Sequence, residues 1–306
     1  MTTVSTSGFY DGAIFSMNSL RTQANNLQQQ ISTGSRLNSS ADDPVAAARM
    51  RALSRADTLS KIDDANATAA KSDLSLADDT LSNVATIVTR IRELAIQAAN
   101  GTLTNSDRIG IGAEITGLRQ NLVALANTQD SRGQSLFGGN GSGQAYTLDA
   151  NGNASYAGSN TSESIALGAG LTVTRGITGP EFMNIGSGGG ATDLLAVVKT
   201  LGDALQGNGG GAAPQAAAQT ALGQLDASLT SITTAQTIVG SRLSWIDTTT
   251  TIRDQMTQQR TDDESSVGGT DIAEAVSRLQ QVSTILQASQ ASFVKLANLN
   301  LFSMLN

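Results

Sequence analysis

The stretch IAEAVSRLQQVSTILQASQASFVKL, residues 272–296, decides the fold of this chain. Its apolar and small residues recur at alternating steps of three and four. Such a narrow stripe is typical of a coiled-coil seam, because a helix packed on a globular core needs a wider apolar face. The stripe consists of Ile272, Ala275, Leu279, Val282, Leu286, Ser289, Phe293 and Leu296. The stretch therefore predicts a long helix that pairs with another helix.

A matching stripe lies near the amino end, in a helix that we expect over residues 13–33. It consists of Met17, Leu20, Ala24, Leu27 and Ile31. A seam has no partner within its own helix, so the two ends must pair with each other or with other copies of the chain. We expect the stripes in 13–33 and 271–302 to form an intermolecular assembly seam, and the alternative is an ordinary intramolecular bundle.

The composition excludes several classes of function. The 306 residues include no cysteine and no histidine, and aromatic residues make up 3%. A disulfide framework and a thiolate metal site are thereby excluded, and the commonest general base is missing. The net charge of −7, with scattered Lys and Arg, argues against nucleic-acid binding. No apolar run reaches the roughly 20 residues of a membrane span, and the first residues lack the features of a Sec signal peptide.

Helical patterns fill most of the chain between the two seams. The expected helices cover 44–99, 106–129, a short stretch from 192, and 214–262. The first of these carries a regular apolar stripe from Ala70 to Ala98. Gly34 is typical of a helix C-cap, and Asp43-Pro44 of an N-cap followed by proline at the first helical position. Residues 34–44 are therefore expected to be a break between two helices, and Asp271 is expected to cap the last one.

A β-rich insertion interrupts the helical pattern between residues 137 and 190. The segments 146–148 and 154–156 flank Asp149-Ala150-Asn151-Gly152-Asn153, and 165–167 and 171–174 flank Gly168-Ala169-Gly170. Short runs separated by such turn residues predict two β-hairpins.

These elements predict a mainly α fold. We expect an elongated antiparallel helical bundle or coiled coil of the N- and C-terminal segments, with a small β-rich domain inserted at the tip. The expected parts are a terminal assembly domain, a helical rod domain and the insertion. Their bounds are 1–43 with 263–306, 44–137 with 191–262, and 138–190.

Each candidate chemical motif lacks residues that its chemistry requires. The Gly-rich run 138–143 lacks the ending of a phosphate loop. The run that begins at Asp149 has Ala154 and Asn160 where a calcium loop needs glycine and glutamate. Ser292 and Lys295 fit a Ser-x-x-Lys pattern without its partner motifs. The acidic doublets are expected to be caps and solvated faces. We therefore predict no catalytic, cofactor-binding or metal-binding residue.

Several motifs resemble the flagellin family. They are ISTGSRLNS at 31–39, DDPVAA at 42–47, ANTQD at 126–130, LFGG at 136–139, TDIAEAVSRLQ at 270–280 and LNLFSML at 299–305. The signature residues are Gly34, Arg36, Asn38, Asp42, Asp43 and Pro44. The Asp-Asp-Pro-Val-Ala form is similar to the family's junction members rather than to its filament members. The match is specific at both ends and weak in 140–190.

The resemblance implies a structural protein of the bacterial flagellum that is not an enzyme. It would be exported by the flagellar type III system and would join the hook zone to the filament, with no cofactor. Its implied partners are other copies of itself, adjacent hook-associated protein and flagellin subunits, and an export chaperone. Neither nucleic acid nor membrane insertion is expected. The alternatives are a filament flagellin and, in a different class, a soluble coiled-coil signalling protein.

Overall fold

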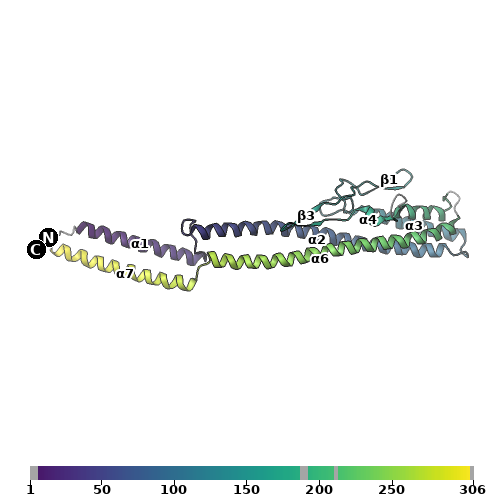
Figure 1. Ribbon diagram of the computed structural model, residues 1–306. Coiled ribbons are helices and arrows are strands. Elements are labelled where there is room, and N and C mark those ends of the chain that lie inside the picture. The colour runs from purple at the N-terminus through teal and green to yellow at the C-terminus, as the bar shows by residue number, and fades with distance from the viewer. Residues whose placement is uncertain (1–5, 187–191, 210–212, 304–306) are drawn as a thin grey trace. The chain divides into compact units, whose positions relative to one another are not determined.

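The computed structural model describes residues 6–186, 192–209 and 213–303 (Figure 1). The elements in chain order are α1 (Thr6–Thr33), α2 (Pro44–Ala98), α3 (Asn105–Ala126), β1 (Tyr146–Leu148), β2 (Ala154–Tyr156), β3 (Ser164–Gly168), β4 (Leu171–Thr174), α4 (Gly179–Met183), β5 (Asn184–Ile185), β6 (Thr192–Asp193), α5 (Leu194–Leu205), α6 (Pro214–Gly268) and α7 (Ile272–Ser303). The chain forms two compact units. The first unit is Met1–Leu59 with Asp254–Asn306, and the second unit is Ser60–Arg253.

The second unit is built on the apolar stripe of α2. The predicted side chains from Ala70 to Ala98 are all buried, and Leu74, Leu81 and Ile91 have no exposed surface. They share one hydrophobic cluster with residues of α3, α5 and α6. Burial of one continuous face explains how a helix of 55 residues stays ordered without aromatic residues.

Local signals set the ends of α3. Thr104 and Asp107 form the capping box at its start: the Asp107 N–H donates to Thr104 Oγ1 over 3.2 Å, and the Thr104 N–H donates to Asp107 Oδ2 over 3.2 Å. The helix ends at Ala126, before the expected end at 129. Asn127 leaves the helix because its side chain bonds the backbone N–H and C=O of Tyr146, over 2.8 and 2.9 Å.

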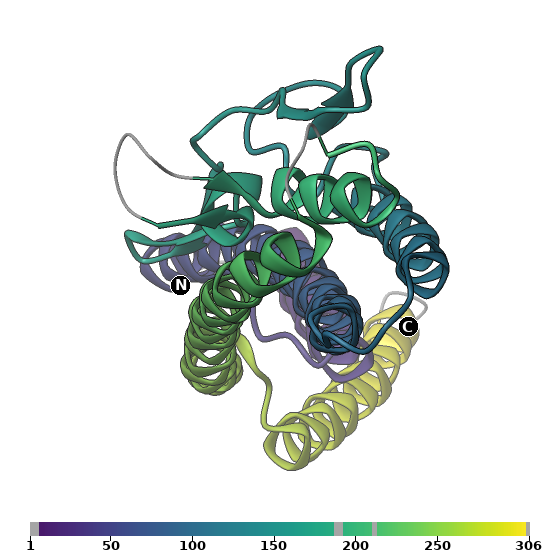
Figure 2. The same ribbon diagram turned by 90° about the vertical axis from the view of Figure 1, so that its right-hand side faces the viewer.

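The β-rich insertion contains the two predicted hairpins. Strands β1 and β2 pair antiparallel, as do β3 and β4, and the insertion also contains α4 and the β5–β6 pair, which the sequence did not predict. Figure 2 shows the strands gathered on one side of the long helices. The Asn66 side chain donates to the Ala166 carbonyl over 3.2 Å, and Arg253 donates to the Leu167 carbonyl over 3.0 Å. The insertion therefore packs along the side of α2 and α6.

In the first unit, α1 and α7 lie side by side and run antiparallel (Figure 1). Helix α1 begins at Thr6, so the expected start at residue 13 was wrong. Gly8 and Gly12 lie inside the helix, at a cost of about 1 kcal/mol each relative to alanine. Packing offsets this cost, because the Tyr10 ring meets the Phe293 ring edge-on with centroids 5.3 Å apart.

Helix α6 continues to Gly268, so its expected end at 262 was also wrong. An ion pair of 3.1 Å between Arg49 and Asp263 joins the helical turns of α2 and α6 that belong to the first unit. Gly268 lies so close to Met50 that a Cβ atom there would be 3.0 Å from the Met50 side chain. These contacts hold the last turns of α6 against α2.

Candidate assembly surface

The amino-terminal stripe forms the half-buried face of α1. Met17, Leu20, Ala24, Leu27 and Ile31 are all half-buried, and the residues between them are largely exposed. Tyr10 and Ala13 extend the same stripe towards the start of the helix. The heptad period predicted from sequence is therefore the period of burial in the structure.

The carboxyl-terminal stripe behaves in the same way along most of α7. Leu279, Val282, Leu286, Ser289 and Phe293 are half-buried, and Ala275 is buried. The first residue of the stripe differs, since Ile272 is 54% exposed at the start of the helix. Leu296 lies in α7, but its side chain is outside the described residues, as are Met304 and Leu305.

A pair of helices can cover each stripe from one side only. Of the seam side chains that the structure describes, Ala275 alone is buried, and large apolar residues elsewhere on the pair are open to solvent. The outward-facing Phe15 is 78% exposed, and Val294 is 56% exposed. The α1–α7 pair thus presents apolar surface that its own two helices do not cover.

The signature residues build the connection between α1 and α2. Gly34 has a φ angle of 67°, which glycine adopts without strain, and its N–H closes the last turn of α1 on the Gln30 carbonyl over 2.9 Å. Beyond this turn, the Arg36 N–H donates to the Gly268 carbonyl over 2.8 Å, and the Thr270 N–H donates to the Gly34 carbonyl over 3.0 Å. The break between α1 and α2 is therefore paired with the break between α6 and α7.

Charged signature residues fasten this connection. The Arg36 guanidinium contacts Asp43 at 3.3 Å and donates to the Val267 carbonyl over 3.0 Å. Asp43 caps α2 by accepting from the Ala46 N–H over 3.0 Å. That backbone hydrogen bond and Arg36 together lower the pKa of the Asp43 carboxyl. The cap is therefore charged at neutral pH.

The other signature residues shape the loop. Asp42 Oδ2 accepts from the backbone N–H groups of Asn38 and Ser39, over 3.1 and 2.7 Å. Asn38 itself is exposed and lines a hollow with Leu37 and Met50. Four of the six signature residues, Gly34, Arg36, Asp42 and Asp43, thus have a local role as turn, tie or cap. Pro44 is the first residue of α2, and the Asn38 side chain is exposed.

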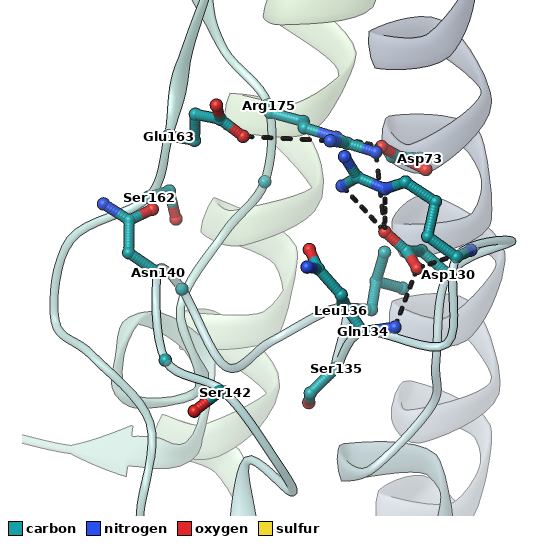
Figure 3. Close-up of a pocket in the computed structure, with 14 residues that line it drawn as sticks. Asp73, Asp130, Gln134, Ser135, Leu136, Asn140, Ser142, Ser162, Glu163 and Arg175 are labelled. Atoms are coloured by element: carbon teal, nitrogen blue, oxygen red, sulfur yellow. Dashed lines mark hydrogen bonds and ion pairs between the residues drawn. The ribbon is translucent and has the colours of Figure 1, made fainter.

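A second polar hollow, of about 370 Å³, lies between the insertion and the helices of the second unit (Figure 3). Arg175 points towards Asp73 and lies 3.5 Å from Asp130 and 3.8 Å from Glu163. Burial opposes the charge on Asp130, but N–H donors from Gln134 and Arg132 outweigh it, so that its pKa is lowered. The acids therefore neutralise Arg175, and the cluster ties β4 to α2.

Three more arginines fasten the insertion through its backbone carbonyls. Arg119 of α3 donates to Gly152, Arg242 donates to Gly176 over 2.6 Å, and Arg253 donates to Leu167 over 3.0 Å. Arg119 also donates to the Leu195 carbonyl of α5 over 3.0 Å. Sequence reasoning missed these contacts and the Arg175 cluster. An isolated arginine in a helical pattern carries no local signal of its distant partner, so the sequence held nothing that would have found them.

The described residues contain neither a candidate metal site nor a candidate membrane span. Within them, no group of three or more acidic side chains is placed to hold a metal ion. The described helices also include none that is both long and apolar enough to cross a bilayer. The Gly-rich run 138–143 forms turns beside the Arg175 hollow, and 149–153 forms the β1–β2 turn around Asp149.

Comparison with known proteins agrees with this architecture. The family model of the bacterial flagellin N-terminal helical region matches residues 4–142. Flagellar hook-associated protein 3 of Escherichia coli is 29% identical over 292 residues, which cover 90% of this chain and 91% of the relative. Flagellin D of Vibrio cholerae is 32% identical over 136 residues, which cover 42% of this chain and 35% of the flagellin.

The fold has solved counterparts as well. The crystal structure of flagellar hook-associated protein 3 from Legionella pneumophila superposes with a TM-score of 0.64 at 18% identity, and covers 71% of this chain and 98% of that one. The likeness to the hook-associated proteins thus runs through both ends and the middle of the chain, whereas the flagellin match is partial. The chain belongs to the flagellin family and is a homologue of flagellar hook-associated protein 3.

Proposed function

We propose that this chain is a structural subunit of the bacterial flagellum that assembles at the junction between the hook-associated zone and the flagellin filament. The observation that carries the proposal is the pair of half-buried seams on α1 and α7. Each is built for helix pairing, and one chain covers each from a single side. Contact with neighbouring subunits would bury the exposed remainder, which is a favourable change in water.

The partners follow from this position. They are further copies of the chain, and adjacent hook-associated protein and flagellin subunits. The whole-length likeness to hook-associated protein 3 supports a flagellar and extracellular location. We further propose that the flagellar type III system exports the chain, that an export chaperone covers the seams beforehand, and that the protein has no enzymatic activity or cofactor.

The assembly seam remains as expected from sequence. It comprises Met17, Leu20, Ala24, Leu27, Ile31, Ile272, Leu279, Val282, Leu286, Phe293 and Leu296. We propose that α1 and α7 of one subunit pack against the same helices of its neighbours through the uncovered sides of this seam. Residues 1–33 and 271–306 would be loosely packed in the dilute monomer. The apolar burial within a single pair of helices offsets little of the conformational entropy that these residues lose when they become ordered.

A filament flagellin is the second candidate. The likeness to hook-associated protein 3 extends over 90% of the chain and the likeness to flagellin D over 42%, so the junction role is better supported. The two candidates differ in assembly, since a flagellin polymerises without limit and a junction subunit stops at a ring. A soluble coiled-coil signalling protein would instead form a stable elongated dimer in isolation.

Antibody labelling of isolated flagella tests the proposal. A peptide tag in the β1–β2 turn, at Asn151, adds an epitope at an exposed site. Label confined to a band at the base of the filament is expected, and the matched control is the same tag on a flagellin. Label along the whole filament would establish the flagellin alternative, and intact flagella without label would exclude both.

A further inference from the structure

A groove with a basic rim runs along α2 in the first unit. Met50, Arg51, Ser54, Arg55 and Thr58 line one hollow, which shares Met50 and Arg51 with the hollow beside the signature loop. Arg51 and Arg55 are exposed and lie about one helical turn apart. We call this feature the arginine groove.

The two arginines keep most of their donors unused. Arg51 donates one hydrogen bond, to Ser40 Oγ over 3.3 Å, and an arginine has five N–H donors. Arg55 has no hydrogen bond or ion pair to any of the described residues. By contrast, the neighbouring Arg49 is paired with Asp263. The groove therefore combines an apolar floor at Met50 with two cations that have no acidic partner among the described residues.

The first unit also carries an acidic face, on the carboxyl-terminal part of α6. Asp254 and Asp262 are exposed and lie eight residues apart, so they share one side of the helix with Gln258 between them. Asp262 accepts a hydrogen bond from the Gln258 side chain over 3.1 Å, and Asp254 forms no ion pair within the described residues. We call this feature the acidic face.

The two features point away from each other. The Arg49–Asp263 ion pair marks the sides on which α2 and α6 face each other. A helix turns by about 100° per residue, which puts Arg51 about 200° round from Arg49, and Asp254 about 180° round from Asp263. By the same turn, Arg55 lies about 120° from Arg49 and Asp262 about 100° from Asp263, so both features face outward from the α2–α6 contact, and Met50 lies at its edge beside Gly268. The two features cannot meet within one chain.

We propose that the arginine groove of one subunit binds the acidic face of a second copy of this chain. The charges are complementary, and unlike patches on different sides of one body form a head-to-tail contact. Such a contact closes into a ring when the rotation between neighbours closes, which is the assembly that a junction requires. The inference rests on the proposed function and identifies a subunit contact separate from the α1–α7 seam.

Cross-linking in isolated flagella tests this contact. Because the chain has no cysteine, the double variant Ser54→Cys, Gln258→Cys places one thiol in the groove and one on the acidic face. A short bismaleimide is expected to produce covalent dimers and higher multimers of the chain. The matched control, Ser54→Cys with Ser277→Cys on α7, places the second thiol elsewhere on the same unit and is expected to give none.

Charge reversal in the same background decides whether the charges matter. Arg51→Glu with Arg55→Glu is expected to lower the cross-linked fraction at least about tenfold, because like charges then face each other. Adding Asp254→Lys and Asp262→Lys to that chain is expected to restore it. Circular dichroism of each variant is expected to show unchanged helix content, since all four side chains are exposed.

The possible outcomes separate the two proposals. Flagella that contain the chain but give no multimers, or multimers that the combined charge swap fails to restore, would overturn the groove contact and leave the junction role standing. A cross-link to a different protein would overturn the choice of a second copy as partner. A chain that is absent from flagella would instead overturn the proposed function.

Discussion

Leu81 and Leu286 lie on helical stripes that look alike in sequence and differ in the structure. Leu81 has no exposed surface in the core of the second unit, whereas Leu286 is half-buried on α7 in the first unit. Replacing a buried leucine by alanine costs about 2–5 kcal/mol, the lost burial plus the cavity that remains. In a domain of about 150–250 residues, each kcal/mol lowers the melting temperature by about 2–4 °C. Leu81→Ala should therefore lower the melting temperature of the second unit by about 4–20 °C.

Leu286→Asp should behave differently. Its side chain is outside the core cluster of the second unit and is still partly open to water, so the new carboxylate stays partly hydrated. The main thermal transition should then be unchanged. Burial in a completed seam would cost several kcal/mol for an unpaired charge, so the variant should be exported and fail to join the filament base.

Two measurements on both variants test this prediction. They are melting curves monitored by circular dichroism, and motility assays. Leu286→Met serves as the matched control and should retain motility, because it keeps an apolar side chain of similar volume. If Leu286→Asp lowers the main melting temperature as much as Leu81→Ala does, the last helix belongs to the monomer's cooperative core. The intermolecular reading of the seam would then have to be abandoned.

Three further predictions follow from the connections between elements. Gly34→Ala should destabilise the first unit by about 1 kcal/mol because of its positive φ. Gly12→Ala, inside α1, should instead stabilise it by about 0.5–1 kcal/mol. The free energy of unfolding of both variants, measured with denaturant, tests this difference. Arg175→Met should destabilise the second unit by about 3–5 kcal/mol, since Asp73 would be left buried without its cation, and equal stability of variant and parent would refute this. Because the pKa of Asp130 is lowered, its charge stabilises the fold at pH values above the pKa of an unfolded aspartate, and this stability is lost as the pH falls through the folded pKa. Asp130→Asn should therefore make the melting temperature fall less steeply at acidic pH than it does in the parent, which melting curves over a pH series measure.

Much of the helical organisation was readable from the sequence. The stripe from Ala70 to Ala98, the cap at Asp43-Pro44 and the two hairpin turns each depend on neighbours a few residues away, and all three are present in the structure. Periodicity and turn chemistry are local properties, so they survive in a sequence without its fold. The heptad spacing of α1 and α7 also matches the half-buried side chains that the structure describes there, with the exception of Ile272, which is exposed.

Tertiary structure decided the rest, because the forces involved act between distant residues. Helix α1 extends back over two glycines since Tyr10 packs on Phe293, and α6 runs on to Gly268 since Met50 and Arg49 hold it. The insertion is fastened by arginines from α3 and α6, whose partners lie far away in the chain. Local propensity ranks the conformations of each segment within about 1 kcal/mol per residue. A single long-range packing contact or buried ion pair is large enough to reverse that ranking, and no local pattern records it.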